Sequence, residues 1–340
     1  MPSSEAPTIA NKRAREWLVV LNAYRKPSAG RGIFEIAITI VPLAVLWGLS
    51  CWAYSVSFWL SLIVAFPAAA FLVRLFLIQH DCGHGAFFRR RSTNDWVGRI
   101  LGVFTLTPYE VWQRSHAVHH ATTGNLDSRG IGDVRTLTVD EYQALDKRGQ
   151  LFYRLYRHPL VFLGIGPSYV FLFQNRIPCD FMSAGWPYWV SAMLTNLGIA
   201  AFATVMVLTV GVVPFIAIHL PIVILAATLG VWLFYVQHQF DEAHWERQPD
   251  WDVHDAGLHG SSYYDLPKAL QWLTANIGMH HLHHLCSRIP FYRLPQVLRD
   301  YPELADVKRI TLVESFQYAG LQLWDERTKR LVSFKSLSPA

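Results

Sequence analysis

The sequence predicts an all-α integral-membrane fold, in which four transmembrane helices form two hairpins and a cytoplasmic helical cap carries a histidine-rich site. Three observations predict it. Of the 340 residues, 52% are hydrophobic and only 16% are charged, whereas a soluble domain usually carries about a quarter charged residues. No Asp, Glu, Lys or Arg occurs from Ile36 through Val73 or from Phe181 through Phe240. Three histidine clusters lie outside these two uncharged stretches.

Each uncharged stretch is long enough for two spans, since a bilayer core needs about 20 helical residues. We place the spans at residues 34–54, 56–79, 187–210 and 214–236. The turns within each pair carry no charge, which predicts tight hairpins. Arg74 lies inside the second span, and we expect its side chain to extend to the nearby surface. By the positive-inside rule, both termini and residues 80–185 are cytoplasmic.

The segments outside the spans have different characters. Residues 1–33 are polar and basic, and we expect a flexible or surface-lying arm before the main domain, residues 34–300. Residues 151–174 mix apolar side chains with Arg, Gly and Pro, which favours helices lying in the membrane interface, with re-entrant packing as the alternative. Residues 301–340 are expected to form a cytoplasmic tail. The four cysteines form no CxxC pair, which predicts free thiols in a reducing compartment.

The histidine clusters have the spacing of metal ligands. They are His80-Asp-Cys-Gly-His84, His116-Ala-Val-His119-His120 and His280-His-Leu-His283-His284. On a helix, positions i, i+3 and i+4 share a face, so one turn can aim two or three imidazoles at a common point. Neutral imidazole suits iron, copper, zinc and nickel. Eight clustered imidazoles exceed what one ion accepts, so the sequence predicts two metals.

The predicted topology brings the three clusters together. The first cluster follows the second span, the second cluster precedes the third span, and the third cluster follows the fourth span. Because each pair of spans returns the chain to the side from which it came, all three clusters are expected at one cytoplasmic membrane surface.

A ninth ligand is expected at the cytoplasmic end of the fourth span, where His238 is the first choice and His244 the competitor. No metal role is expected for the remaining histidines, which are His158, His219, His254, His259 and His281. Metal-bound imidazoles usually donate their second N–H to a carboxylate or a carbonyl. The candidate carboxylate partners are Asp81, Asp127, Asp133, Asp241, Asp255 and Asp265.

With these clusters the chain resembles the membrane fatty-acid desaturase family, whose mark is one HxxxH box and two HxxHH boxes around four membrane helices. The resemblance covers about residues 34–300. It also includes residues 132–142, 235–240, 260–267, 276–284 around the third box, and 288–294. These segments are similar to the bacterial and cyanobacterial omega-6, or delta-12, acyl-lipid desaturases.

The resemblance implies a non-haem di-iron centre that uses O2 and two electrons to place a cis double bond in a membrane-lipid acyl chain, with release of water. The electrons would come from an external donor, a ferredoxin or a separate cytochrome b5, in a bacterial inner or cyanobacterial-type membrane. No nucleic-acid partner is expected. The implied iron ligands are His80, His84, His116, His119, His120, His280, His283 and His284, with His238 as the ninth.

Other functions are compatible with the same pattern. Hydroxylases, epoxygenases and acetylenases share the three boxes and differ in the chemical step after hydrogen abstraction. A histidine-rich membrane metal transporter is the alternative from a different class, although transporters usually place polar ligands within the spans near the midplane. Several double-bond positions, lipid head groups and electron donors also fit the sequence.

Overall fold

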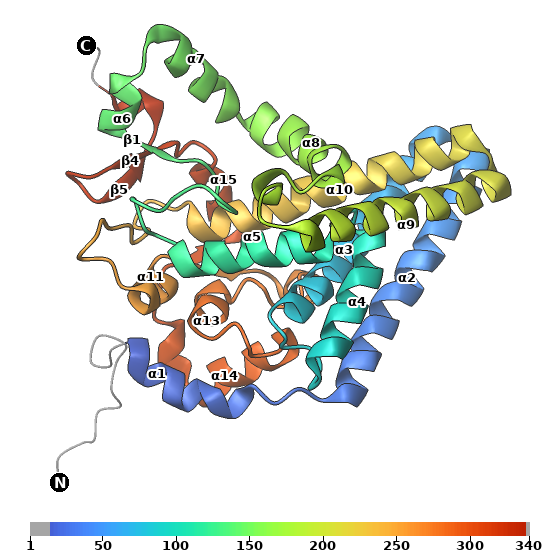
Figure 1. Ribbon diagram of the computed structural model, residues 1–340, viewed down its shortest axis with the longest axis horizontal. Coiled ribbons are helices and arrows are strands. Elements are labelled where there is room, and N and C mark those ends of the chain that lie inside the picture. The colour runs from blue at the N-terminus through green and yellow to red at the C-terminus, as the bar shows by residue number, and fades with distance from the viewer. Residues whose placement is uncertain (1–13, 338–340) are drawn as a thin grey trace.

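The computed structural model describes residues 14–337 and consists mainly of helices (Figure 1). Within this range, four helices are long and apolar enough to cross a membrane. They are α2 (Ala29–Val56), α3 (Phe58–Gly83), α9 (Trp186–Val210) and α10 (Val212–His238). The four predicted spans correspond to these four helices, which are between one and seven residues longer than predicted.

Single residues separate the paired spans, as the uncharged turns predicted. Ser57 is extended between α2 and α3, and its hydroxyl accepts a hydrogen bond from the N–H of Trp59. Gly211 joins α9 to α10 with a φ of 90°, a left-handed conformation that glycine adopts without steric cost. Its N–H bonds the Val207 carbonyl and so caps α9.

Helix α3 forms the centre of the membrane part. It packs against α2 on one side and α10 on the other. In the most apolar 18-residue stretch of α3, 56% of the residues are buried, against 6% in the corresponding stretch of α9. His80 lies in the last turn of α3 and His238 is the last residue of α10, so these two helices deliver both histidines to the same end of the bundle.

Arg74 does not extend to the surface, so this prediction is wrong. Its guanidinium forms an ion pair with Glu35 of α2, and both side chains are 1% exposed. Arg74 also donates to Thr39 and lies 4.2 Å from the ring centroid of Trp272. Helix α2 begins at Ala29, before the uncharged stretch, and therefore carries a carboxylate to which Arg74 can pair inside the protein.

The cap is built from short helices on the histidine side of the bundle (Figure 1). Its α-helices and the π-helical turn η3 are α1 (Ala14–Leu21), α4 (Arg91–Phe104), α5 (Tyr109–Thr122), α6 (Val139–Ala144), α7 (Lys147–Tyr156), η3 (Val161–Ile165), α8 (Gly166–Leu172), α11 (Val253–His259), α12 (Lys268–Leu273), α13 (His280–Leu285), α14 (Leu294–Asp300) and α15 (Leu312–Tyr318). The 3-10 turns are η2 (Asn22–Tyr24), η4 (Gln174–Arg176), η5 (Cys179–Phe181), η6 (Phe291–Arg293), η7 (Pro302–Ala305) and η8 (Phe334–Ser336).

Two small sheets interrupt the otherwise helical fold. Strand β1 (Leu137–Thr138) pairs in parallel with β4 (Leu323–Asp325), which pairs in antiparallel with β5 (Arg330–Val332). Strands β2 (Tyr263–Asp265) and β3 (Arg309–Thr311) form a parallel pair. Strands of two or three residues are too short for a hydrophobic period to reveal them in a sequence.

Both ends of the described chain pack into the cap. In α1, Trp17 and Leu21 are fully buried, and Arg15 forms an ion pair with Asp252. Of the predicted flexible or surface-lying arm, residues 14–28 are ordered with α1 packed on the cap, residues 29–33 begin α2, and residues 1–13 lie outside the described residues. Residues 301–337 contribute β3, β4 and β5, so this part of the predicted cytoplasmic tail packs into the cap core, and its cytoplasmic position stays a prediction.

The segment predicted to lie in the membrane interface forms α7, η3 and α8. Its helices α8 and η3 pack along α10. Several of its large apolar side chains are exposed, among them Phe152, Leu160, Ile165, Tyr169 and Phe173. Such exposure is what an interfacial position requires, and that position stays a prediction.

Candidate metal centre

The structure brings all nine predicted histidines together in two groups. Within each group, one potential ligand atom per residue lies within 4.8 Å of the others. Neither group includes a cysteine or a carboxylate, and His244 is in neither. The first group is His80, His84, His116, His120 and His283, and the second is His119, His238, His280 and His284.

The HxxHH spacing serves both groups at once. On α5, His116 and His120 are one full turn apart and join the first group, while His119 turns toward the second. On α13 the assignment is reversed, because the i, i+4 pair His280 and His284 joins the second group and His283 the first. Each HxxHH box therefore links the two groups, so a shift of either α5 or α13 would disturb both groups.

The first box and the ninth histidine are placed by the ends of the spans. His80 lies in the last turn of α3, and the N–H of His84 closes that helix on the His80 carbonyl. His238 is the last residue of α10. The ring nitrogens Nε2 of His238 and His280 are 2.8 Å apart, which joins the membrane bundle to the cap.

The converging ring nitrogens fit metal ions. Nε2 of His119 lies 3.2 Å from Nε2 of His238 and 3.3 Å from Nε2 of His284. In the first group, Nε2 of His120 lies 3.1 Å from that of His116 and 3.0 Å from that of His283. A neutral imidazole has one N–H and one lone pair, so several lone pairs meet at each point, and a cation there satisfies them together.

His84 supports the same conclusion. Its Nε2 atom is buried and has no hydrogen-bond partner among the described residues. A buried polar atom without a partner costs free energy, and a bound metal would remove that cost. Both groups thus suit a di-metal site, and imidazole nitrogens suit iron, copper, zinc or nickel rather than magnesium or calcium.

Burial keeps these histidines in the form that binds metals. Burial lowers the pKa of His84, His116 and His120 well below the usual value, and the neighbouring histidines lower it further. The pKa values of His283 and His284 are lowered well below normal for the same two reasons. The imidazoles are therefore neutral near pH 7, as metal ligands must be.

Two of the six candidate carboxylates contact the histidine boxes. Asp133 accepts a hydrogen bond from Nδ1 of His119, which leaves Nε2 of that ring facing the second group. Asp81 lies with Oδ1 3.5 Å from Nδ1 of His80, and its Oδ2 accepts from the N–H of Phe291. The hydrogen bond from His119 to Asp133 fixes the tautomer and the orientation of that ring, whereas Nδ1 of His80 has no hydrogen-bond partner among the described residues.

The other four carboxylates are not brought to the histidine boxes, which corrects their prediction. Three of them form ion pairs with basic side chains: Asp127 with Arg247, Asp241 with Lys308 and Asp265 with Arg309. Asp255 lies in the first turn of α11. All four were chosen by residue type alone, and the nearby arginines and lysines that bind three of them come from distant parts of the chain.

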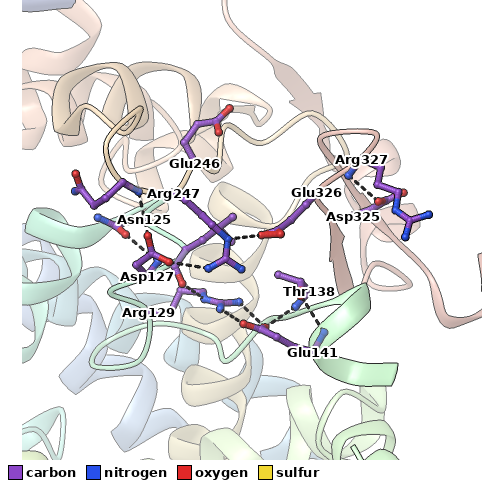
Figure 2. A network of polar contacts seen from close by, with 12 residues as sticks. Asn125, Asp127, Arg129, Thr138, Glu141, Glu246, Arg247, Asp325, Glu326 and Arg327 are labelled. Carbon is purple, nitrogen blue, oxygen red and sulfur yellow. Dashed lines mark hydrogen bonds and ion pairs between the residues drawn. The ribbon is translucent and has the colours of Figure 1, made fainter. Parts of the chain in front are cut away.

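The loop that carries Asp133 is held from outside by a polar network (Figure 2). Arg247 donates to Asp127 of the loop and to Glu326 of the turn after β4, with both distances 2.7 Å. Strand β1 at the end of the same loop pairs with β4. These contacts fix both sides of the segment that brings Asp133 to His119.

Gly132 is a functional residue that the sequence motifs did not single out. Its φ is 79°, and a Cβ atom there would lie 2.8 Å from the Ser115 carbonyl and 3.0 Å from Cβ of His119. Only glycine fits this approach to α5, and it places the adjacent Asp133 against the histidine. The available signal was the Gly-Asp pair that begins segment 132–142, one of the segments of the family resemblance.

A cavity of about 500 Å³ reaches the histidines. It is lined by His80 and His116 of the first group and by His280 of the second. Below them, the lining residues of α3 and α10 are all apolar or glycine: Leu72, Val73, Phe76, Leu77, Val223, Ala226, Ala227, Gly230, Val231, Leu233 and Phe234. The arrangement can therefore hold an apolar ligand against a pair of metal ions.

Comparisons with known proteins agree with this geometry. Residues 57–315 match the family model described as "Fatty acid desaturase". A fatty acid desaturase of Bacillus subtilis strain 168 is 42% identical over 330 residues, covering 97% of this chain and 93% of the relative.

Relatives with more specific names are more distant. An sn-1 oleoyl-lipid 12-desaturase of Anabaena variabilis is 28% identical over 273 residues, covering 74% of this chain and 71% of the relative. An sn-1 acyl-lipid omega-3 desaturase (ferredoxin) of Synechocystis sp. is 28% identical over 266 residues, with 74% and 67% covered. These matches, the four spans and the two histidine groups exclude the metal-transporter alternative. The chain belongs to the fatty acid desaturase family and is an integral-membrane oxidoreductase.

Proposed function

We propose that this desaturase places a cis double bond at the delta-12 (omega-6) position of a membrane-lipid acyl chain, with two iron ions held by the nine grouped histidines. One observation carries the proposal. A single cavity, apolar along α3 and α10, meets histidines of both groups. An acyl methylene placed there would lie beside both metals.

Iron would supply the oxygen chemistry that an unactivated methylene requires, since such a carbon offers no acid, base or leaving group. The protein positions the acyl chain and excludes water from the reacting carbon. Phe76 and Trp112 pack edge to face at the cavity wall next to His80, and apolar walls exclude water from the reacting carbon. A chain held in one conformation presents the same carbon each time.

The two ends of the cavity differ in polarity, which gives the acyl chain a direction. Gln174, Asn175 and Asp180 line it in the cap, and Asp180 is exposed. Leu72 and Val223 line it inside the bundle. A lipid ester and head group belong at the polar end, because a buried polar group without a partner is costly. The methyl end then points into the bundle.

Asp133 would hold the proton of the His119 ring at Nδ1. Its carboxylate keeps the N–H of His119 on Nδ1, so that the lone pair on Nε2 stays directed at the second metal. In the first group, Asp81 lies beside Nδ1 of His80.

The names of relatives support the bond position and the donor. Relatives from three cyanobacteria are sn-1 oleoyl-lipid 12-desaturases. Two others are omega-3 desaturases whose names include ferredoxin. We accordingly propose a ferredoxin as donor, with a separate cytochrome b5 as the alternative. The cationic loops support a cytoplasmic cap and cytoplasmic termini in a bacterial inner membrane.

Product analysis tests the proposal. The chain is expressed in a bacterium that makes oleoyl lipids but no polyunsaturated ones, beside the variant His284→Ala. Gas chromatography with mass spectrometry is expected to show linoleoyl chains with the unaltered protein and none with the variant. A hydroxylated product would move the function to the hydroxylases, and a double bond elsewhere in the chain would refute the delta-12 position.

A further inference from the structure

We propose that Gly230 sets the length of the acyl chain that the enzyme accepts, because its missing side chain leaves open the part of the cavity that receives the methyl end. This inference rests on the proposed function, since it assumes that an acyl chain occupies the cavity. It assigns a role to one position of α10 that contacts no histidine of the metal centre.

Gly230 belongs to one face of α10. Val223, Ala226, Gly230, Phe234 and Gln237 follow one another at spacings of three or four, so they project from the same side of the helix. All five line the cavity. A Cβ atom built on Gly230 would meet nothing within 4 Å. A larger side chain at this position would therefore project into the cavity rather than into packed protein.

The depth of Gly230 in the cavity is what would let a side chain at this position limit the length of the bound acyl chain. With a rise of about 1.5 Å per residue, Gly230 lies about 10 Å below Gln237, and Val223 lies about another 10 Å deeper. Across the cavity, α3 presents His80 at the metal end and Leu72 about 12 Å below it. Gly230 is thus midway along the apolar arm, beyond the metal centre and before its deep end.

The chain end that passes Gly230 is the methyl end. Every residue of α3 and α10 that lines the arm below His80 and Gln237 is apolar or glycine. His80 and His280, which are 4% and 2% exposed, close its upper end. No residue that α3 or α10 contributes to this arm could bond an ester, so an acyl chain enters with its hydrocarbon tail first.

Filling the arm at Gly230 is expected to penalise the longer of two chains. Each buried methylene improves binding about fourfold. Oleoyl chains have two methylenes more than palmitoleoyl chains. A leucine that displaces those two methylenes would change the preference between the chains roughly fifteenfold.

Gly48 offers a matched control. It lies within the span α2, is exposed, does not line the cavity, and a Cβ atom on it also meets nothing within 4 Å. The full-length protein and its variants Gly230→Leu and Gly48→Leu are expressed in a host whose lipids contain both palmitoleoyl and oleoyl chains. The converted fraction of each chain is measured, together with the amount of protein and metal in the membrane.

The unaltered protein and Gly48→Leu are expected to give the same ratio of products. Gly230→Leu is expected to lower conversion of oleoyl relative to palmitoleoyl chains roughly fifteenfold. An unchanged ratio overturns the inference, as does an equal loss on both chains with normal metal content. If Gly230→Leu fails to accumulate, Gly230→Ala decides by a smaller shift in the same direction or by none. A wild-type protein that forms no double bond refutes the proposed function, and the inference with it.

Discussion

Removal of the Asp133 carboxylate is expected to weaken the metal centre although Asp133 is not a proposed ligand. Asp133 accepts the hydrogen bond from Nδ1 of His119, and Nε2 of the same ring lies 3.2–3.3 Å from two other histidines of the second group. In Asp133→Ala the ring can rotate and change tautomer. Loss of such a partner typically costs 10–100-fold in metal affinity or activity, or about 1.4–2.7 kcal/mol.

Asp127→Ala is the matched control for this variant. Asp127 lies in the same loop, but its carboxylate bonds Arg247 and the N–H of Gln248 rather than a histidine. Both variants are purified, and metal per chain and the linoleoyl fraction produced in cells are measured. We expect a large loss for Asp133→Ala and a smaller one for Asp127→Ala, which removes only one of the contacts that hold the loop. Equal behaviour of the two variants would refute the role assigned to Asp133.

The site and the membrane part support three further predictions. His119→Ala should abolish activity without preventing membrane insertion, whereas His244→Ala should retain activity, because His244 is in neither group; measured conversion in His119→Ala would contradict this. Gly132→Ala should lower metal content by pushing the loop away from α5, which metal analysis checks against the unaltered protein. Arg74→Gln removes one of the two cations that pair with Glu35 and leaves Arg31 as the other, so it should cost less than the about 3–5 kcal/mol of a fully unpaired buried charge; an unchanged melting temperature in detergent would show that the pair with Arg74 is unimportant.

The membrane part of the fold could be predicted because charge and length constrain it strongly. In lipid, the backbone N–H and C=O groups must be hydrogen-bonded within the chain, which a helix achieves. Two long uncharged stretches with neutral turns therefore leave few arrangements other than helical hairpins. The same topology placed the three boxes on one side. His238 could be preferred over His244 because it lies at the end of α10, where the other boxes meet.

The remaining features depend on contacts between distant segments. Asp133 was one of six equivalent candidates, and only the folded loop shows that it meets His119 while Asp127 meets Arg247. The pairing of Arg74 with Glu35 depends on where α2 begins, which the uncharged stretch did not define. The division of each HxxHH box between the two histidine groups also depends on how α5 and α13 face each other.

Metal analysis of the purified protein tests the central claim most directly. The chain is purified from cells grown with iron-57, its metals are counted against protein, and Mössbauer spectra are recorded. The arrangement of nine histidines in two groups predicts two iron ions per chain, both with nitrogen-rich ligation and coupled to each other. A single ion per chain, or two zinc ions in an active preparation, would contradict the di-iron centre.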